Sequence, residues 1–304
     1  MNTQQVKNII ESTSDIAFII GNGINRYFGN NAISWENLLL ELWNENNGNT
    51  QQQTSIPRGV SFTEFYDALL IKNFTKKDFT AELQKSVQKK MSVWVPIENG
   101  LKSILNKIKS KNAPVLTTNF DDLIPKSLHL EFRKLEEKGF TDFYPWSCYY
   151  SDMQVNNPSK NFGVWYPNGM IKYHRSIKLG LSQYMGSVSR ARKLIHKDVE
   201  RIEFTGKNQN YWEGFKTWLH IIFNNSLFIF GLGLEESEVF IRWLLIERAK
   251  YFKKFPKRRH KGWYIMKKKE KEEITEGKKF FFKSVGIDVI ELNEYKNVYE
   301  DIWE

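Results

Sequence analysis

The sequence predicts an α/β fold: a Rossmann-like open parallel sheet flanked by helices, with a helical insertion after the first strand. Short apolar runs rich in β-branched and aromatic residues recur along the chain, and segments with helical apolar spacing separate them. Two of these runs stop at glycines. Strands that alternate with helices form parallel sheets whose connecting helices cover both faces. These observations together predict the fold class.

The first predicted strand covers residues 16–20 and stops at a turn that contains Gly21 and Gly23. A continuous apolar run is typical of a strand buried on both faces. A helix is predicted to begin after Ser34, a good N-cap. A strand, a glycine turn and a helix offer backbone N–H groups to a pyrophosphate. Because Arg26 takes the place of the third glycine of G-x-G-x-x-G, a tight turn without a ligand is the alternative interpretation.

The remaining elements are predicted from the same patterns. Residues 1–13 are predicted to form a helix, and about 60–110 a helical insertion. Further strands are predicted at 114–118, 170–174, 226–230, 262–266 and 287–291, with helices at 187–203 and 209–224, after Gly233, and between the last two strands. Residues 44–60 are predicted to be a loop and about 140–168 an irregular aromatic segment. The chain is therefore predicted to be a single domain, 1–304.

The composition bounds the class of protein. With 304 residues, 41% of them hydrophobic and 15% aromatic, the chain can bury a large core. It contains no run of about 18 uncharged apolar residues, so no membrane span is expected. The N-terminus lacks the features of a secretory signal. Cys148 is the only cysteine, which excludes an internal disulfide and a four-cysteine zinc site, and fits a cytoplasmic location. No metal is expected.

Positive charge is concentrated near the C-terminus. The whole chain carries 45 Lys and Arg against 35 Asp and Glu, a net charge of +10. Residues 250–271 hold eleven of the basic residues and only one acidic residue, Glu270. Such a segment can contact nucleic acid or an acidic partner. Because stacking aromatics at regular spacing are absent from it, a solvated helix end and loop is the alternative interpretation.

Polar residues follow several predicted strands. The strand ends at residues 21–25, 118–121 and 231–233 are expected to converge on one rim, and the strand ending at His174 brings an imidazole there. Each residue also has a structural interpretation. Asn119 can be a helix N-cap, Asp121 and Asp122 can complement a helix dipole, and His174 can be a core histidine. The convergence is more informative than any one of these motifs.

Taken in order, these segments resemble the sirtuin superfamily, and more closely its bacterial anti-phage branch of sirtuin-like NAD-hydrolysing proteins. The resemblance runs from about residue 10 to residue 292. It rests on Gly21-Asn22-Gly23-Ile24-Asn25, Thr117-Thr118-Asn119-Phe120-Asp121, the His174 segment and Phe230-Gly231-Leu232-Gly233-Leu234-Glu235-Glu236-Ser237-Glu238.

The resemblance implies a role for each of these segments in binding NAD. Asn119 would position the nicotinamide ribose and the attacking water, Asp121 would hold the carboxamide, and His174 would be the catalytic histidine. Gly231 and Gly233 would pass beneath the adenosine ribose. The pyrophosphate and the neighbouring ribose would be held by Gly21, Asn22, Gly23 and Asn25.

Two departures separate the chain from sirtuin deacylases. Arg175 follows the histidine where sirtuins usually have glycine, so the local turn is expected to differ. Deacylases also carry a four-cysteine zinc module, which a chain with one cysteine cannot build. The resemblance therefore favours hydrolysis over deacylation.

The implied function is an NAD glycohydrolase that uses NAD as its substrate and depletes it in an anti-phage defence system of the abortive-infection type. Its activity is expected to be controlled by assembly, either as a homo-oligomer or with a separately encoded partner such as a HerA-type ATPase. One alternative is an NAD-dependent protein deacylase or ADP-ribosyl transferase. The other is a non-catalytic adaptor that binds nucleotide, or nucleic acid through residues 250–271.

Overall fold

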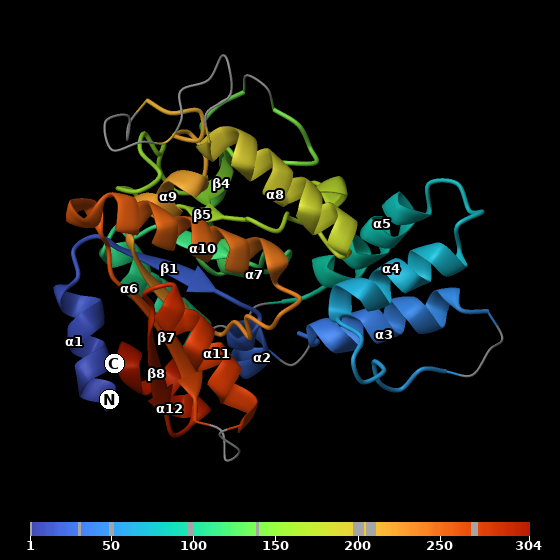
Figure 1. Ribbon diagram of the computed structural model, residues 1–304, viewed down its shortest axis with the longest axis horizontal. Helices are drawn as coiled ribbons and strands as arrows, with labels where there is room; N and C mark the ends of the chain where they lie inside the picture. Colours follow the sequence, from blue (N-terminus) through green and yellow to red (C-terminus); the bar gives the residue numbers. More distant parts are fainter. Residues whose placement is uncertain are drawn as a thin grey trace.

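An eight-stranded sheet forms the centre of the protein, with the strand order β3-β4-β5-β2-β1-β6-β7-β8 (Figure 1). The structure is a computed structural model that describes residues 2–29, 32–48, 52–95, 100–137, 140–196, 204, 211–268 and 273–304. The parallel strands are β1 (Ile16–Ile20), β2 (Val115–Thr117), β5 (Val164–Trp165), β6 (Ser226–Phe230), β7 (Gly262–Lys267) and β8 (Asp288–Leu292). Two strands at one edge, β3 (Glu131–Lys134) and β4 (Cys148–Ser151), are antiparallel. The predicted α/β Rossmann-like class is confirmed.

Alternate side chains of the central strand enter two different cores. Ala17 and Ile19 pack on one face with α8 (Leu181–Ile195), α9 (Leu219–Asn224), α10 (Val239–Lys254) and α11 (Glu273–Ser284). Ile16, Phe18 and Ile20 pack on the other face with α1 (Thr3–Ser12), α6 (Gly100–Ser110), α12 (Tyr295–Tyr299) and η3 (Asp301–Trp303). Because successive strand residues point to opposite faces, a wholly apolar strand is stable only between two helical layers.

The helical insertion has a core of its own. The described residues between β1 and β2 form five helices: α2 (Gly23–Phe28) and α6 pack against the sheet, whereas α3 (Trp35–Asn46), α4 (Phe62–Lys72) and α5 (Phe79–Ser92) form the separate core. Leucines of α3 pack with apolar residues of α4 and α5, and with Phe120 and Ile177 from the main body. The predicted start of α3 is confirmed, because the Ser34 hydroxyl accepts a hydrogen bond from the Asn37 N–H at 3.0 Å. Figure 1 shows α3, α4 and α5 as a lobe beside one end of the sheet.

Two predictions about extended structure are wrong. Residues 170–174 form no strand: Met170 makes an isolated bridge to Tyr173, and the 3-10 helix η1 (His174–Ser176) follows. The Ser176 hydroxyl lies 2.6 Å from the Tyr173 carbonyl oxygen and 2.9 Å from the Met170 nitrogen, which closes the segment into a tight loop. The segment predicted to be irregular, 140–168, contains β4 and β5, which are joined by stacking of Tyr149 on Trp165.

Several helix boundaries also differ from those predicted. α8 begins at Leu181 rather than 187, and the second predicted helix is helical only at Leu219–Asn224 within the described residues. Residues 197–203 and 205–210 lie outside the described residues. α10 begins at Val239, so Glu235 and Glu236 precede the helix and Glu238 is its N-cap.

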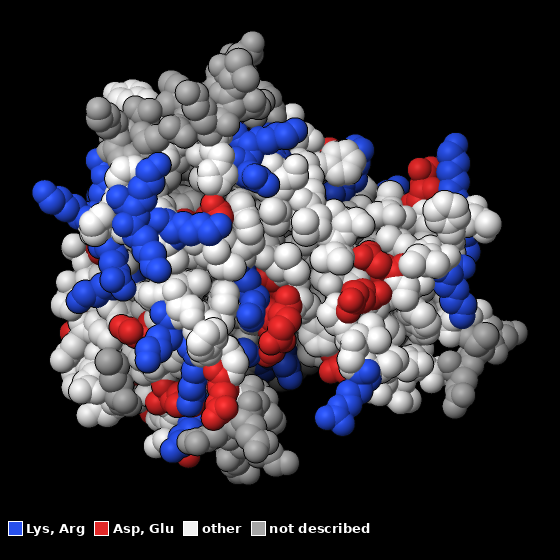
Figure 2. All heavy atoms as spheres, in the orientation of Figure 1, with Lys and Arg blue, Asp and Glu red and all other residues white. Residues whose placement is uncertain are grey.

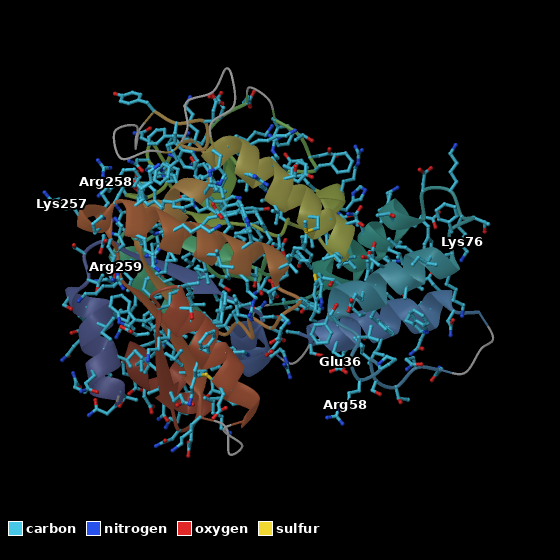
Figure 3. The ribbon with its side chains drawn as sticks, in the orientation of Figure 1. Glu36, Arg58, Lys76, Lys257, Arg258 and Arg259 are labelled. Atoms are coloured by element: carbon cyan, nitrogen blue, oxygen red, sulfur yellow. The ribbon has the colours of Figure 1, made fainter. Side chains whose placement is uncertain are left out.

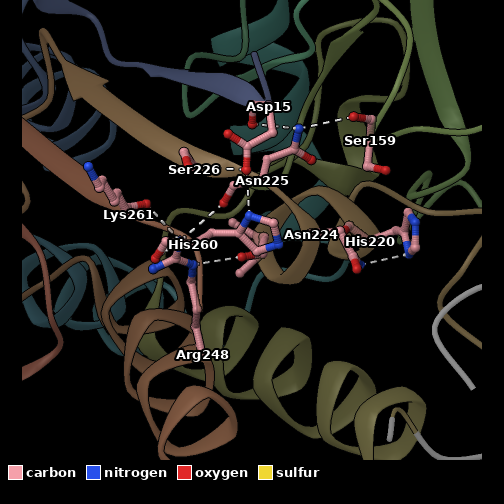
Figure 4. A network of polar contacts seen from close by, with 10 residues as sticks. Asp15, Ser159, His220, Asn224, Asn225, Ser226, Arg248, His260 and Lys261 are labelled. Atoms are coloured by element: carbon pink, nitrogen blue, oxygen red, sulfur yellow. Dashed lines mark hydrogen bonds and ion pairs between the residues drawn. The ribbon is translucent and has the colours of Figure 1, made fainter. Parts of the chain in front are cut away.

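A polar network lies at the amino ends of β1 and β6 (Figure 4). Arg248 of α10 is buried and donates to the carbonyl oxygens of Ile222, Asn225, His260 and Lys261. Asp15 contacts the His260 imidazole, and this hydrogen bond lowers the pKa of Asp15. His220 of α9 is buried, and burial lowers its pKa to about 3. This network ties α10 to the sheet.

Across the described part of the chain, no helix combines the length and the apolar character that a membrane crossing requires.

Candidate active site

The carboxyl ends of β1, β2 and β6 meet at a cleft of about 1370 Å³. The chain passes from β1 to β2 on one side and reaches β6 on the other, so the strand order reverses at this point. Open α/β sheets bind their ligands at such a reversal, and pockets for small ligands measure roughly 300–1,000 Å³. Figure 2 shows the surface notched between the sheet and the lobe of α3–α5. The cleft is therefore large enough for a dinucleotide.

The cleft brings together six of the predicted site residues: Asn22, Gly23, Asn119, Asp121, Gly231 and Gly233. The other three, Gly21, Asn25 and His174, are not among the residues that line it. Gly21 and Asn25 contact residues that line the cleft, namely Gly231 and Asp121. His174 lies in the separate turn η1.

The glycines after β1 and β6 allow two turns to pack against each other. A Cβ atom on Gly21 would lie 2.4 Å from the Gly231 carbonyl oxygen, and one on Gly23 would lie 2.8 Å from it. The Gly23 N–H donates to the same oxygen at 2.7 Å. Gly231 has a φ of +66°, a conformation that glycine adopts without strain. The packing of the two turns alone therefore accounts for Gly21, in agreement with the alternative interpretation of a tight turn.

Asn25 and Asp121 join the turn after β1 to the turn after β2. Both side chains are buried, and the Asn25 Nδ2 donates to the Asp121 Oδ2 at 2.9 Å. The Leu123 N–H donates to the Asp121 Oδ1 at 3.0 Å. Burial raises the pKa of Asp121 to about 6. Asp121 thus holds the floor of the cleft in place with both carboxylate oxygens.

Asn119 presents a buried amide to the cleft. Its backbone N–H donates to the Thr117 hydroxyl at 3.2 Å, and that hydroxyl donates to the Ile20 carbonyl oxygen at 3.1 Å. Within the described residues the side-chain Nδ2 has no hydrogen-bond partner. Asn119 is not a helix cap, because α7 (Leu123–Ser127) begins after Asp122. A buried donor without a partner is costly, so the position suits a residue that binds a ligand or a water molecule.

His174 lies in η1, outside the cleft wall. The 3-10 helix packs against α5, where the Gln84 Nε2 donates to the Arg175 carbonyl oxygen at 3.3 Å. The pKa of His174 is lowered by partial burial and by the positive charges of Lys85 and Arg175. Its imidazole is therefore neutral at pH 7, and it is not among the residues that line the cleft.

The cleft also contains residues that sequence reasoning missed. Asn168, Tyr184 and Glu238 line it together with Asn119. Asn168 is buried and hydrogen-bonded to Glu238, whose pKa is raised by burial to about 7. Glu238 stands in the sequence only as the last residue of the segment that carries the resemblance, and Asn168 is distinguished there only by preceding a glycine. Their proximity arises from folding, since 70 positions separate them.

The loop after β6 is held by two side chains. The Tyr264 hydroxyl donates to the Leu232 carbonyl oxygen at 2.7 Å. The Lys278 Nζ donates to the Gly233 carbonyl oxygen at 2.6 Å and pairs with Glu235 at 2.7 Å. These contacts fix the loop that carries Gly231 and Gly233 into the cleft.

The described part of the basic segment lies apart from the cleft. Figure 3 shows Lys257, Arg258 and Arg259 at one end of the molecule, whereas Glu36, which lines the cleft, is on the side of the α3–α5 lobe. Residues 269–271 of the segment lie outside the described residues. Across the described ranges, no group of three or more His, Cys, Asp or Glu side chains is arranged to hold a metal ion.

A family model for the SIR2-like domain matches residues 114–290, which is more than half of the chain. The chain belongs to the SIR2-like domain family. A search of curated proteins found no match. The matched part of this SIR2-like domain begins just before β2 and ends within β8, so the turn with Gly21 and Gly23 lies outside it and joins it through the pairing of β1 with β2 and β6.

Membership of the SIR2-like family indicates NAD-related activity, and the residues of the cleft fit NAD. Asn119 contributes a buried hydrogen-bond donor without a partner among the described residues. Asn168 and Glu238 each contribute a buried acceptor oxygen that also has no partner among the described residues. NAD offers acceptors on its phosphates and donors on its riboses and carboxamide, so both kinds of group find complements. The SIR2-like fold and the cleft thus fit an NAD-utilising enzyme.

Proposed function

We propose that this SIR2-like domain is an NAD glycohydrolase, in which water and NAD give nicotinamide, ADP-ribose and a proton. The observation that carries the proposal is the buried amide of Asn119, whose Nδ2 has no partner among the described residues and which lines a cleft of about 1370 Å³. Hydrolysis at a ribose needs a positioned water more than an added acid, because nicotinamide is a good leaving group. Fixed orientation of reactants is a large source of rate.

Each residue then has a role that its chemistry supports. Asn119 orients the attacking water without adding charge to the cleft. Asp121, fixed by Asn25, faces the carboxamide. His174 accepts a proton, for which a neutral imidazole is suited. His174 is not itself among the residues that line the cleft, but its segment is attached beside Asn119, because the Ile171 N–H donates to the Phe120 carbonyl oxygen at 2.8 Å.

Two alternative functions differ from hydrolysis in whether, and under which condition, NAD is consumed. A deacylase or ADP-ribosyl transferase would consume NAD only when an acceptor is present. An adaptor would bind nucleotide or nucleic acid without consuming NAD. Incubating the purified chain with NAD, with and without an acylated peptide, and following nicotinamide and ADP-ribose by chromatography tests all three.

The outcomes of this experiment differ clearly. Release of nicotinamide and ADP-ribose in equal amounts without peptide is expected. Release that depends on the acylated peptide contradicts hydrolysis and supports deacylation. Salt-sensitive DNA binding without NAD loss supports the adaptor, since contacts with phosphates weaken as salt rises.

The wider role that we propose is NAD depletion in anti-phage defence, with activity controlled by assembly of this chain with itself or with an ATPase of the HerA type. Exposed apolar side chains support assembly: Ile71 is 74% exposed and Phe74 is 88% exposed at the end of α4. Light scattering of the chain, alone and with its partner, should show an assembly whose formation raises nicotinamide release. A fully active monomer would contradict control by assembly.

A further inference from the structure

Two buried acceptor atoms lie side by side in the cleft, apart from the residues given roles above. Glu238 comes from the N-cap position of α10, and Asn168 from the loop between β5 and η1. The Asn168 amide hydrogen-bonds the Glu238 carboxyl. The Glu238 Oε2 and the Asn168 Oδ1 are both buried and have no partner among the described residues. Buried polar atoms without a partner are rare in native proteins and call for an explanation.

We propose that Glu238 and Asn168 together bind the 2′,3′-diol of one ribose of NAD. This inference rests on the proposed function, because it names how the same cleft recognises its substrate. A carboxylate oxygen and an amide oxygen can each accept a hydrogen bond from one hydroxyl of a cis-diol. Neither can accept from a phosphate, which has no donor to offer. The pair therefore selects the sugar rather than the pyrophosphate.

The local structure sets the orientation of both groups. Because the amide nitrogen of Asn168 donates to Glu238, its oxygen is left to face a ligand. The Lys178 N–H donates to the Asn168 backbone carbonyl oxygen at 3.0 Å, which anchors the loop. Glu238 is itself partly exposed, so rotation of its carboxyl group can present either oxygen to the cleft. Ser237, which precedes Glu238, lines the same cleft and carries a hydroxyl group.

Burial and a nearby negative charge raise the pKa of Glu238 into the neutral range. Burial raises its pKa to about 7, Asn168 opposes this by donating a hydrogen bond, and the negative charge of Glu235 adds to it. Tyr184 of α8 lies close enough to interact with Glu238, and burial raises the pKa of Tyr184 well above its usual value, so it stays neutral. A hydroxyl that donates to the carboxylate favours the charged form and lowers its pKa. Binding of NAD should therefore release protons at pH 7.

Calorimetry of NAD and ADP-ribose binding at pH 7, in two buffers of different ionisation enthalpy, measures both affinity and proton release. Glu238→Gln is expected to weaken binding of both ligands roughly 10- to 100-fold, as expected for loss of a hydrogen bond to a charged group, and to abolish proton release. Asn168→Ala should also weaken binding. The matched control is Glu236→Gln, which makes the same change of charge two residues away at an exposed position outside the cleft lining.

Two NAD analogues identify the group that is bound, one lacking both hydroxyls on the adenosine ribose and the other lacking both on the nicotinamide ribose. One of them should bind the wild type and Glu238→Gln equally. If both analogues still bind Glu238→Gln more weakly, the diol is not the ligand of Glu238. Unchanged affinity and unchanged proton release in Glu238→Gln would also overturn the inference.

The binding measurements separate this inference from the proposed function. If the wild type binds NAD without releasing nicotinamide, the proposal of hydrolysis is wrong, and the diol site is then judged by the binding measurements alone. Nicotinamide release with Glu238→Gln binding NAD as tightly as wild type would overturn only the diol site. Failure of the wild type to bind NAD or ADP-ribose would overturn both. Circular dichroism of each variant establishes that it is folded.

Discussion

Asn25 donates a hydrogen bond from its Nδ2 to the Asp121 Oδ2 at 2.9 Å, between side chains that are 1% and 3% exposed. This bond joins the turn after β1 to the turn after β2, at the point where the strand order reverses. Because the first turn also packs on Gly231 after β6, the three strand ends form one rigid rim. The cleft is therefore built before any ligand binds, which lowers the entropy cost of binding.

Asn119→Ala should remove most NAD turnover. The substitution deletes the amide that we propose to orient water, and loss of a positioned group commonly costs about 10²-fold or more in rate. Nicotinamide release measured by chromatography checks this, with Asn8→Ala, an exposed amide on α1, as the control. Turnover equal to wild type in Asn119→Ala would refute the role of Asn119.

His174→Ala tests the one predicted catalytic residue that the cleft does not include. We expect nicotinamide release to fall about 10²-fold, as for loss of a general base, while NAD affinity changes little. His174 has a lowered pKa, so it accepts protons across the neutral range. If His174→Ala retains full turnover, proton acceptance belongs to a residue within the cleft wall instead.

Asp121 should make stability depend on pH in an unusual direction. Burial raises its pKa from 3.8 to about 6, so the folded state holds a proton between these values that the unfolded state has lost. The stabilisation is complete below the unfolded pKa and is lost as the pH rises through about 6. Two pKa units correspond to roughly 3 kcal/mol.

Urea unfolding of the wild type and of Asp121→Asn from pH 4 to pH 7 isolates this effect, because the amide does not titrate. The wild type should lose stability relative to the variant as the pH rises. If the difference in the free energy of unfolding between the two proteins stays constant with pH, the pKa of the Asp121 carboxyl group is not raised in the folded state.

Gly21→Ala should destabilise the protein, whereas Gly233→Ala should not. A Cβ on Gly21 would lie 2.4 Å from a backbone oxygen, and one on Gly233 would lie 3.3 Å from the end of the Glu235 side chain, which can move. Overpacking against backbone costs about 1–3 kcal/mol. Thermal unfolding should show a lower Tm for Gly21→Ala alone; equal Tm values would mean that the two turns do not pack as described.

Arg248→Lys should destabilise the protein without direct effect on the cleft. The guanidinium donates to four carbonyl oxygens at 2.9–3.2 Å, and a single ammonium cannot reach all of them. We expect a loss of roughly 2–4 kcal/mol in the free energy of unfolding, because buried acceptors are left without donors. Lys253→Arg, at an exposed position on the same helix, should be neutral.

Much of the sheet could be predicted from the sequence because its strands are locally encoded. Residues 16–20 and 227–230 are apolar throughout and are followed by glycines, and the strands predicted at 16–20 and 226–230 agree with β1 and β6. The segment at 170–174 looked similar, but the Ser176 hydroxyl closes it into a loop. Ser176 lies two residues beyond the predicted strand, so the apolar pattern of 170–174 gives no indication of this hydrogen bond.

The sequence alone determined the five strands β1, β2, β6, β7 and β8, the resemblance to the sirtuin superfamily and the glycine and asparagine turns of the rim, because these depend on the spacing of nearby residues. Only the tertiary structure decided which side chains meet. It brought Asn168 and Glu238 together, bonded Asn25 to Asp121, and held His174 on a separate turn. Such contacts depend on how elements pack across long sequence separations, which local propensity and periodicity do not specify.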